Sequence, residues 1–225
     1  IFDPAMYIDR YGWGDATNTT IGPLRSLNYS FGMNAAYDDF TILYNHMYRN
    51  AHSSLGQNTA WYYYDNPDAI MGETIQWLTL NHKCSLDKIR FTTNLSYLNF
   101  QRDPKSFYDF IYVPGRKAYK FAASDVILFE EVVEWDPTDE LEFIGGISLS
   151  YSGALPKTND LTEPFDESLY TPFSKEVDFE DPIMGKFGIN PITYTNLAGF
   201  LQTTYAIDWL KLMGGVRFDN HSDYG

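Results

Sequence analysis

Apolar and polar side chains alternate over long stretches of this chain, and this alternation limits the possible folds more than any other feature. The clearest runs begin at Asp139 and Asp208. Over Leu141–Ser150 and Leu210–Asp219 the two runs repeat the same pattern of apolar, glycine and polar positions. A period of two indicates a β-strand, because successive side chains of a strand point to opposite faces. These runs have the length of roughly 9–11 residues that crosses a bilayer at a tilt.

The same start, an Asp followed by apolar residues at every second position, also occurs near residues 38 and 87. Another alternating run precedes each of the four starts, so the sequence predicts about eight strands. Two of the preceding runs, 73–83 and 123–134, are less regular than the others. The second contains Glu130, Glu131 and Glu134, and its register is therefore open.

Short and long connections alternate between the expected strands. Short turns are expected near residues 38, 85, 137 and 207, and long polar loops at about 50–72, 102–122 and 153–194, with 1–25 as the end of an earlier outside loop. Outer-membrane barrels have short periplasmic turns and longer outside loops. The predicted fold is therefore an all-β, antiparallel up-and-down transmembrane β-barrel. Residues 1–225 would form a partial barrel domain, because both ends look cut and eight strands leave two open edges. A self-contained eight-stranded barrel is the alternative.

Composition agrees with strands that have one apolar and one polar face. Aromatic residues make up 17% of the chain, with 18 Tyr and 16 Phe, although the mean hydropathy is −0.34. The net charge of −14 argues against nucleic acid as a partner, because phosphate backbones attract Lys and Arg. The chain contains none of the sequence motifs of hydrolases, phosphate-binding loops or zinc proteases. We therefore expect no enzyme activity and no cofactor.

The last thirty residues resemble the hairpin of TonB-dependent outer-membrane receptors. The resemblance rests on Asn196-Leu197-Ala198-Gly199-Phe200-Leu201-Gln202, a short turn, and then Leu210-Lys211-Leu212-Met213-Gly214-Gly215-Val216-Arg217-Phe218-Asp219. That family has at this place an Asn, a Gln some six residues later, and after the turn Gly-aliphatic-Arg-aromatic-Asp. The stretch Tyr37–Arg49 is similar to barrel strands of the same receptors.

The resemblance implies a large barrel, of 22 strands, in the cell outer membrane of a Gram-negative-type bacterium. It also implies a plug domain and TonB as partners, besides outer-membrane lipid and a nutrient ligand. The expected function is TonB-dependent uptake of an iron-siderophore, cobalamin or oligosaccharide. A passive porin or fatty-acid-type channel, a structural or adhesive barrel, and a soluble β-protein are the alternatives.

Candidate functional residues fall into three sets. The lumen-lining set, opposite the aliphatic face of its strands, includes Arg90, Asn94, Glu142, Lys211, Arg217 and Asp219. Arg90 and Arg217 could contact plug carboxylates, or the set could simply face water, with interior ion pairs to Glu142 and Asp219. The loop residues Trp61, Tyr62, Tyr63 and Tyr64 could contact ligand or belong to an aromatic belt at the membrane interface. The acidic segment 160–181 is a solvated loop or a cation site, and whether it binds a metal is open.

Overall fold

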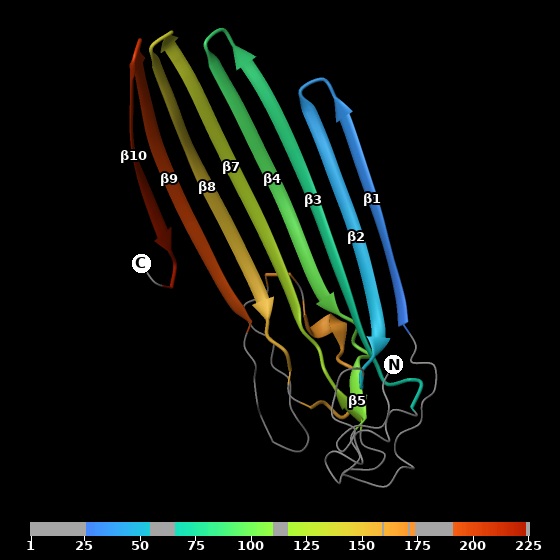
Figure 1. The fold of residues 1–225 in the computed structure, drawn as a ribbon. Coiled ribbons are helices and arrows are strands. Elements are labelled where there is room, and N and C mark those ends of the chain that lie inside the picture. Colours follow the sequence, from blue (N-terminus) through green and yellow to red (C-terminus); the bar gives the residue numbers. More distant parts are fainter. Residues whose placement is uncertain are drawn as a thin grey trace, which may run out of the picture.

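The structure is a computed structural model that describes residues 26–54, 66–109, 117–158, 160–170, 172–173 and 191–223. Its main element is an antiparallel sheet of eight strands, in the order β1-β2-β3-β4-β7-β8-β9-β10 (Figure 1). The strands are β1 (Ser26–Tyr37), β2 (Phe40–His52), β3 (Ile70–Leu86), β4 (Ile89–Arg102), β7 (Ala123–Thr138), β8 (Leu141–Leu155), β9 (Ile192–Ile207) and β10 (Leu210–His221). Each strand pairs with the next strand of this sheet along the chain, so the predicted all-β, eight-stranded up-and-down arrangement is confirmed.

Tight hairpin turns join the strands at one end of the sheet, which we call the turn end. They lie at Asp38–Asp39, Asp87–Lys88, Asp139–Glu140 and Asp208–Trp209. Asp38, Asp87 and Asp208 have positive φ angles of 52°, 52° and 37°. Positive φ in a two-residue hairpin turn matches the twist of the flanking strands, and Asp tolerates this conformation better than most residues. The connections β2–β3, β4–β7 and β8–β9 lie at the opposite end, the loop end (Figure 1).

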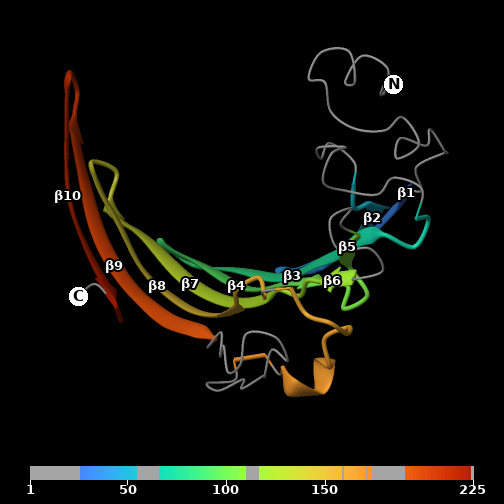
Figure 2. The same ribbon diagram turned by 90° about the horizontal axis from the view of Figure 1, so that it is seen from below.

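The sheet is strongly curved across its width but is not closed into a barrel (Figure 2). In the part of the chain that the structure describes, β1 and β10 form its two edges and each has one neighbouring strand. The curvature gives the sheet a concave and a convex face. Because paired residues of neighbouring strands share a face, the pairing register assigns the paired strand residues to one of these faces.

The loop end carries the smaller elements of the fold. Strands β5 (Phe107–Asp109) and β6 (Lys117–Tyr119) form a two-stranded sheet, and η2 (Glu167–Leu169) is a short 3-10 helix. Asp166 caps η2 by accepting a hydrogen bond from the Ser168 backbone N–H at 2.9 Å. No helix among the described residues is long and apolar enough to cross a membrane.

The compact hydrophobic cluster of this structure also lies at the loop end and not along the middle of the sheet. Phe121, Ala123, Leu155 and Phe165 are buried together, with Leu161 and Tyr170 against them. The rings of Phe121 and Phe165 stack with their centroids 4.2 Å apart. Neither face of the long strands is covered by a second layer of the described chain over most of its length (Figures 1 and 2).

Candidate functional site: the two faces of the sheet

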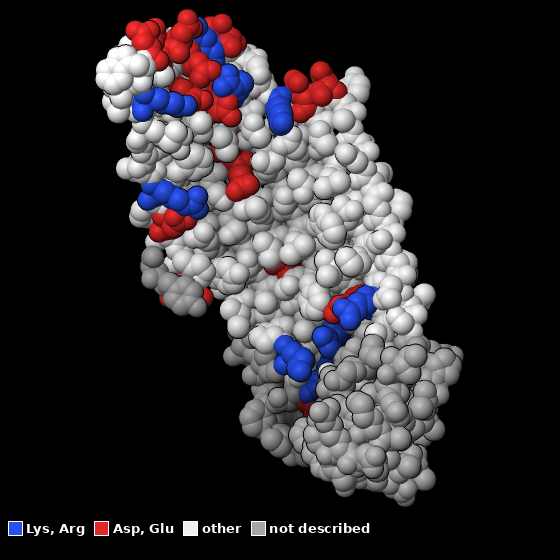
Figure 3. All heavy atoms as spheres, in the orientation of Figure 1, with Lys and Arg blue, Asp and Glu red and all other residues white. Residues whose placement is uncertain are grey.

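The two faces differ in charge. The concave face carries nearly all charged side chains of the paired strands: Arg49, Glu73, Lys83, Arg90, Arg102, Glu130, Glu134, Glu142, Lys211, Arg217 and Asp219. Figure 3 shows this face, with charged groups concentrated toward the turn end and again toward the loop end. Between the hairpin turns and the loop end, the convex face carries the charged residues Asp125 and Glu131.

The six residues of the lumen-lining set, Arg90, Asn94, Glu142, Lys211, Arg217 and Asp219, all lie on the concave face. Arg217 donates to Asp219 with Nε 2.8 Å from Oδ2. Asn94 accepts a hydrogen bond of 2.6 Å from Asn81 of the neighbouring strand. The structure thus brings together residues from three hairpins on one polar surface.

Three of these residues line one hollow at the turn end. Arg90, Glu142 and Lys211 border a cavity of about 520 Å³ together with the acidic residues of two hairpin turns. Arg90 contacts Glu134 at 2.8 Å and Asp136 at 2.7 Å. Glu134 lies directly opposite Arg90 in the β4–β7 pairing.

A second group of charges crosses the loop end of the concave face. Arg49 on β2 pairs with Glu73 on β3, and Glu73 pairs with Arg102 on β4. Arg49 approaches Glu73 at 3.7 Å. Lys157 lies near Arg102 and Lys120, and its pKa is lowered, chiefly by burial and then by these two cations. Sequence reasoning missed this group, because only the pairing of three strands brings the two arginines to either side of one glutamate.

The convex face is mainly apolar and is exposed along the strands. Val216 is 73% exposed, Phe218 64% and Phe31 60%. Further exposed apolar residues of this face are Leu27, Tyr29, Met33, Leu95, Ile147, Leu149, Leu197, Leu201 and Leu212. A soluble monomer rarely exposes a continuous apolar surface of this extent.

Aromatic residues mark both ends of this apolar surface. Near the turn end, Trp135 stacks on Phe143 with ring centroids 5.4 Å apart. Near the loop end, Tyr29 stacks on Tyr48 at 5.2 Å and on His46 at 5.7 Å. On three strands the aromatic pairs of this face are eight positions apart: Tyr29 and Tyr37, Phe40 and Tyr48, and Phe143 and Tyr151. Eight residues of strand span about 26 Å.

The two carboxylates of the convex face are held by hydrogen bonds. Asp125 is fully buried and accepts from Tyr97 at 2.5 Å, Asn99 at 2.9 Å and Tyr170 at 2.7 Å. Glu131 accepts from the Thr93 hydroxyl at 2.6 Å. A buried carboxylate is tolerated when such donors replace the water that it has lost.

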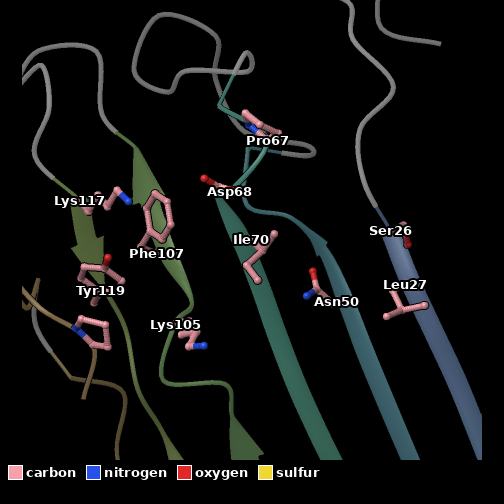
Figure 4. A pocket seen from close by; sticks show the side chains of 11 residues that line it. Ser26, Leu27, Asn50, Pro67, Asp68, Ile70, Lys105, Phe107, Lys117 and Tyr119 are labelled. Carbon is pink, nitrogen blue, oxygen red and sulfur yellow. The ribbon is translucent and has the colours of Figure 1, made fainter. Parts of the chain in front are cut away.

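Another hollow opens on the convex side at the loop end and was not anticipated from the sequence. It has a volume of about 650 Å³ and lies between the ends of β1, β2 and β3 and the β5–β6 hairpin (Figure 4). Phe107 and Tyr119 form its aromatic wall, with ring centroids 5.2 Å apart. Lys117 lies over the Phe107 ring, with Nζ 4.7 Å from its centroid. This hollow opens on the convex face, because its lining includes three residues of that face, Leu27, Asn50 and Ile70.

Two sets of expected residues lie wholly or partly outside the described part of the chain. Trp61, Tyr62, Tyr63 and Tyr64 lie outside it, as do residues 174–181 of the acidic segment. Of the described acidic residues, Asp166 caps η2, and hydrogen bonds from Ser168 lower its pKa. No group of three or more His, Cys, Asp or Glu side chains that could hold a metal ion occurs among the described residues.

Comparison of the chain with protein-family models, with curated proteins and with solved structures gives no match.

Proposed function

We propose that this sheet is part of the wall of a transmembrane outer-membrane β-barrel that takes up a scarce nutrient in a TonB-dependent way. The observation that carries this proposal is the contrast between the two faces. A charged concave face suits a water-filled or plugged lumen, and an exposed apolar convex face suits lipid. A soluble β-protein would have to cover the convex face with further chain or with a partner.

The aromatic pairs of the convex face support the same proposal. Transmembrane barrels have an apolar band about 25 Å tall between two aromatic girdles. Phe143 and Tyr151 are about 26 Å apart along β8, and at the usual strand tilt of about 35–45° this corresponds to a height of roughly 20 Å, comparable with that band. Tyr and Trp favour this position because their rings are apolar and their N–H or O–H groups can bond to water.

The open edges fit a larger barrel better than a free sheet. Unpaired backbone N–H and C=O groups have no water to bond inside hydrocarbon, so β1 and β10 would each need a further strand there. Closure of eight strands on themselves would instead require β1 to pair with β10. The proposed parent barrel therefore has more than eight strands, and its lumen would hold a plug that contacts the concave face.

The TonB-dependent step is tested by uptake into cells. Cells with and without the gene are given a radiolabelled ferric siderophore, cyanocobalamin or a maltodextrin, each with and without a protonophore. We expect one of these probes to accumulate only when the gene is present and the proton-motive force is intact. Gene-dependent accumulation that the protonophore leaves unchanged would instead establish the passive channel. If the gene affects accumulation of none of the probes, the uptake proposal fails.

A further inference from the structure

The strongest unassigned site is the small hollow at the loop end of the concave face. It has a volume of about 230 Å³, and Arg49, Ser53, Glu73, Arg102 and Tyr108 are among the residues that line it. Arg49, Glu73 and Arg102 lie side by side across β2, β3 and β4. Two guanidinium groups thus flank a single carboxylate, and the row keeps one surplus positive charge.

Two polar atoms of this hollow lack a partner. The Ser53 hydroxyl and the Arg102 Nε are both buried, and neither has a hydrogen bond in the part of the chain that the structure describes. Ser53 as a whole is 4% exposed. Arg102 directs another guanidinium nitrogen, Nη1, at the Met71 sulfur at 3.0 Å, which is a weak acceptor. Buried donors are normally bonded, so two unpaired donors in one hollow suggest an absent acceptor.

We infer that this hollow binds an oxyanion, a carboxylate or phosphate group, held by Arg102, Arg49 and the Ser53 hydroxyl. A guanidinium group matches the paired oxygens of such an anion, and a hydroxyl adds a neutral hydrogen bond. The two unpaired atoms are closed to bulk solvent, so the anion reaches them by a small rotation of their side chains. The inference does not depend on whether the sheet lines a barrel.

The charges around the hollow favour an anion over a cation. Glu73 is the carboxylate in its lining, and its contact with Arg49 is long, at 3.7 Å. On the other side, Lys157 lies near Arg102 and adds positive charge, whereas the charge of Lys120 is paired with Asp160. The volume of the hollow is below the roughly 300 Å³ of the smallest usual ligand pockets. It therefore suits one anionic group, either free or at the end of a larger solute.

Calorimetric titration of the full-length protein tests the inference. Sodium phosphate and sodium succinate serve as separate probes, with ionic strength held constant by sodium chloride. We expect saturable binding of at least one probe, and the stronger of the two identifies the preferred group. Arg102→Gln should weaken that binding by about tenfold or more, because it removes a charge-assisted contact. Ser53→Ala should weaken it by about fivefold and leaves the net charge unchanged.

Lys83→Gln is the matched control, because it removes one positive charge from the same face near its other end. We expect it to change binding by less than about twofold, because the distance from the hollow exceeds the Debye length. Circular dichroism of each variant checks its folding. Equal weakening by Arg102→Gln and Lys83→Gln, or no saturable binding of either probe up to about 10 mM, would overturn the inference. So would undiminished binding in folded Ser53→Ala and Arg102→Gln.

Discussion

At the residue scale, Asp125 of β7 shows how the sheet and the loop end are joined. It is fully buried on the convex face, close to the loop end, and accepts hydrogen bonds from three side chains. One donor, Tyr170, comes from the long β8–β9 connection and therefore ties that loop to β7. Burial raises the pKa of Tyr170, and its hydrogen bond to the Asp125 carboxylate raises it further.

Replacing Tyr170 with Phe tests this hydrogen bond between the loop and β7. Tyr170→Phe should lower the free energy of unfolding by about 1–2 kcal/mol at neutral pH, because it removes a hydrogen bond to a buried carboxylate. The measurement is urea unfolding of the full-length protein. Tyr151→Phe is the control, since the Tyr151 hydroxyl has no hydrogen-bond partner among the described residues and its ring stays against Phe173. An equal loss in both variants would mean that the hydrogen bond contributes nothing.

The same pair of variants gives a pH dependence. The pKa of Tyr170 is raised in the folded protein above its ordinary value of 10.0, so the protonated form is favoured by folding. Its contribution is fully present below pH 10.0 and is lost as the pH rises above that value. Stability of the wild-type protein should therefore fall more steeply above pH 10.0 than that of Tyr170→Phe. Parallel pH profiles would contradict the raised pKa.

At the scale of the elements, β8 packs closely against its two neighbouring strands at a glycine, Gly146. A Cβ atom added at Gly146 would lie 2.6 Å from the Phe200 ring and 2.8 Å from the Glu131 carbonyl oxygen. The ring can move, but the carbonyl belongs to the paired strand β7. Glycine at this position thus allows Phe200 of β9 to lie over the backbone of β8.

Gly146→Ala should therefore destabilise the protein by about 1–3 kcal/mol, the usual range for overpacking. Gly214→Ala is the matched control in β10, because a Cβ atom there meets nothing within 4 Å. We expect Gly214→Ala to be neutral or slightly stabilising, since alanine restricts the unfolded chain more than glycine does. Urea unfolding of both variants decides the question, and a cost at Gly214 equal to that at Gly146 would contradict the close packing.

The sequence predicts those strands best in which one face is consistently apolar. The regular run from Leu210 is the strand Leu210–His221 in the structure. The irregular runs at 73–83 and 123–134 belong to the longer strands Ile70–Leu86 and Ala123–Thr138. In β7 the alternation is obscured because Glu131 lies on the apolar face, where Thr93 of the neighbouring strand binds it. That partner is distant in sequence, and a register shift after Trp135 disturbs the pattern further.

At the scale of the whole molecule, strand pairing determines which residues of different strands share a surface. Alternation along a single strand cannot show this. The sequence placed Arg90, Glu142 and Arg217 opposite the aliphatic face of their own strands, and pairing brings these strand faces together on one concave surface. The Arg49–Glu73–Arg102 row and the β5–β6 hairpin depend on contacts between distant segments and were not predicted. Short strands such as β5, with three residues, are also too short to show an alternation of apolar and polar side chains in the sequence.

Introducing a charged residue on the convex face tests whether that face contacts lipid. Val216→Arg should cost about 2–4 kcal/mol if its side chain lies near the middle of the bilayer. Met213→Arg places the same charge on the concave face of the same strand and should cost less than about 1 kcal/mol, because a polar lumen hydrates it. Folding yield into bilayers and urea unfolding measure both variants. Equal costs would argue against lipid on the convex side.

The most direct test compares two neighbouring residues of β9, an interior strand of the sheet. Leu201 lies on the convex face and Gln202 on the concave face. Each is replaced by a spin-labelled cysteine in the full-length protein, in a Cys84→Ser background, and the protein is studied in bilayers. We expect the label at Leu201 to collide mainly with oxygen, which concentrates in lipid, and the label at Gln202 mainly with a water-soluble nickel chelate. Equal access of the chelate to both labels would contradict a membrane-spanning sheet.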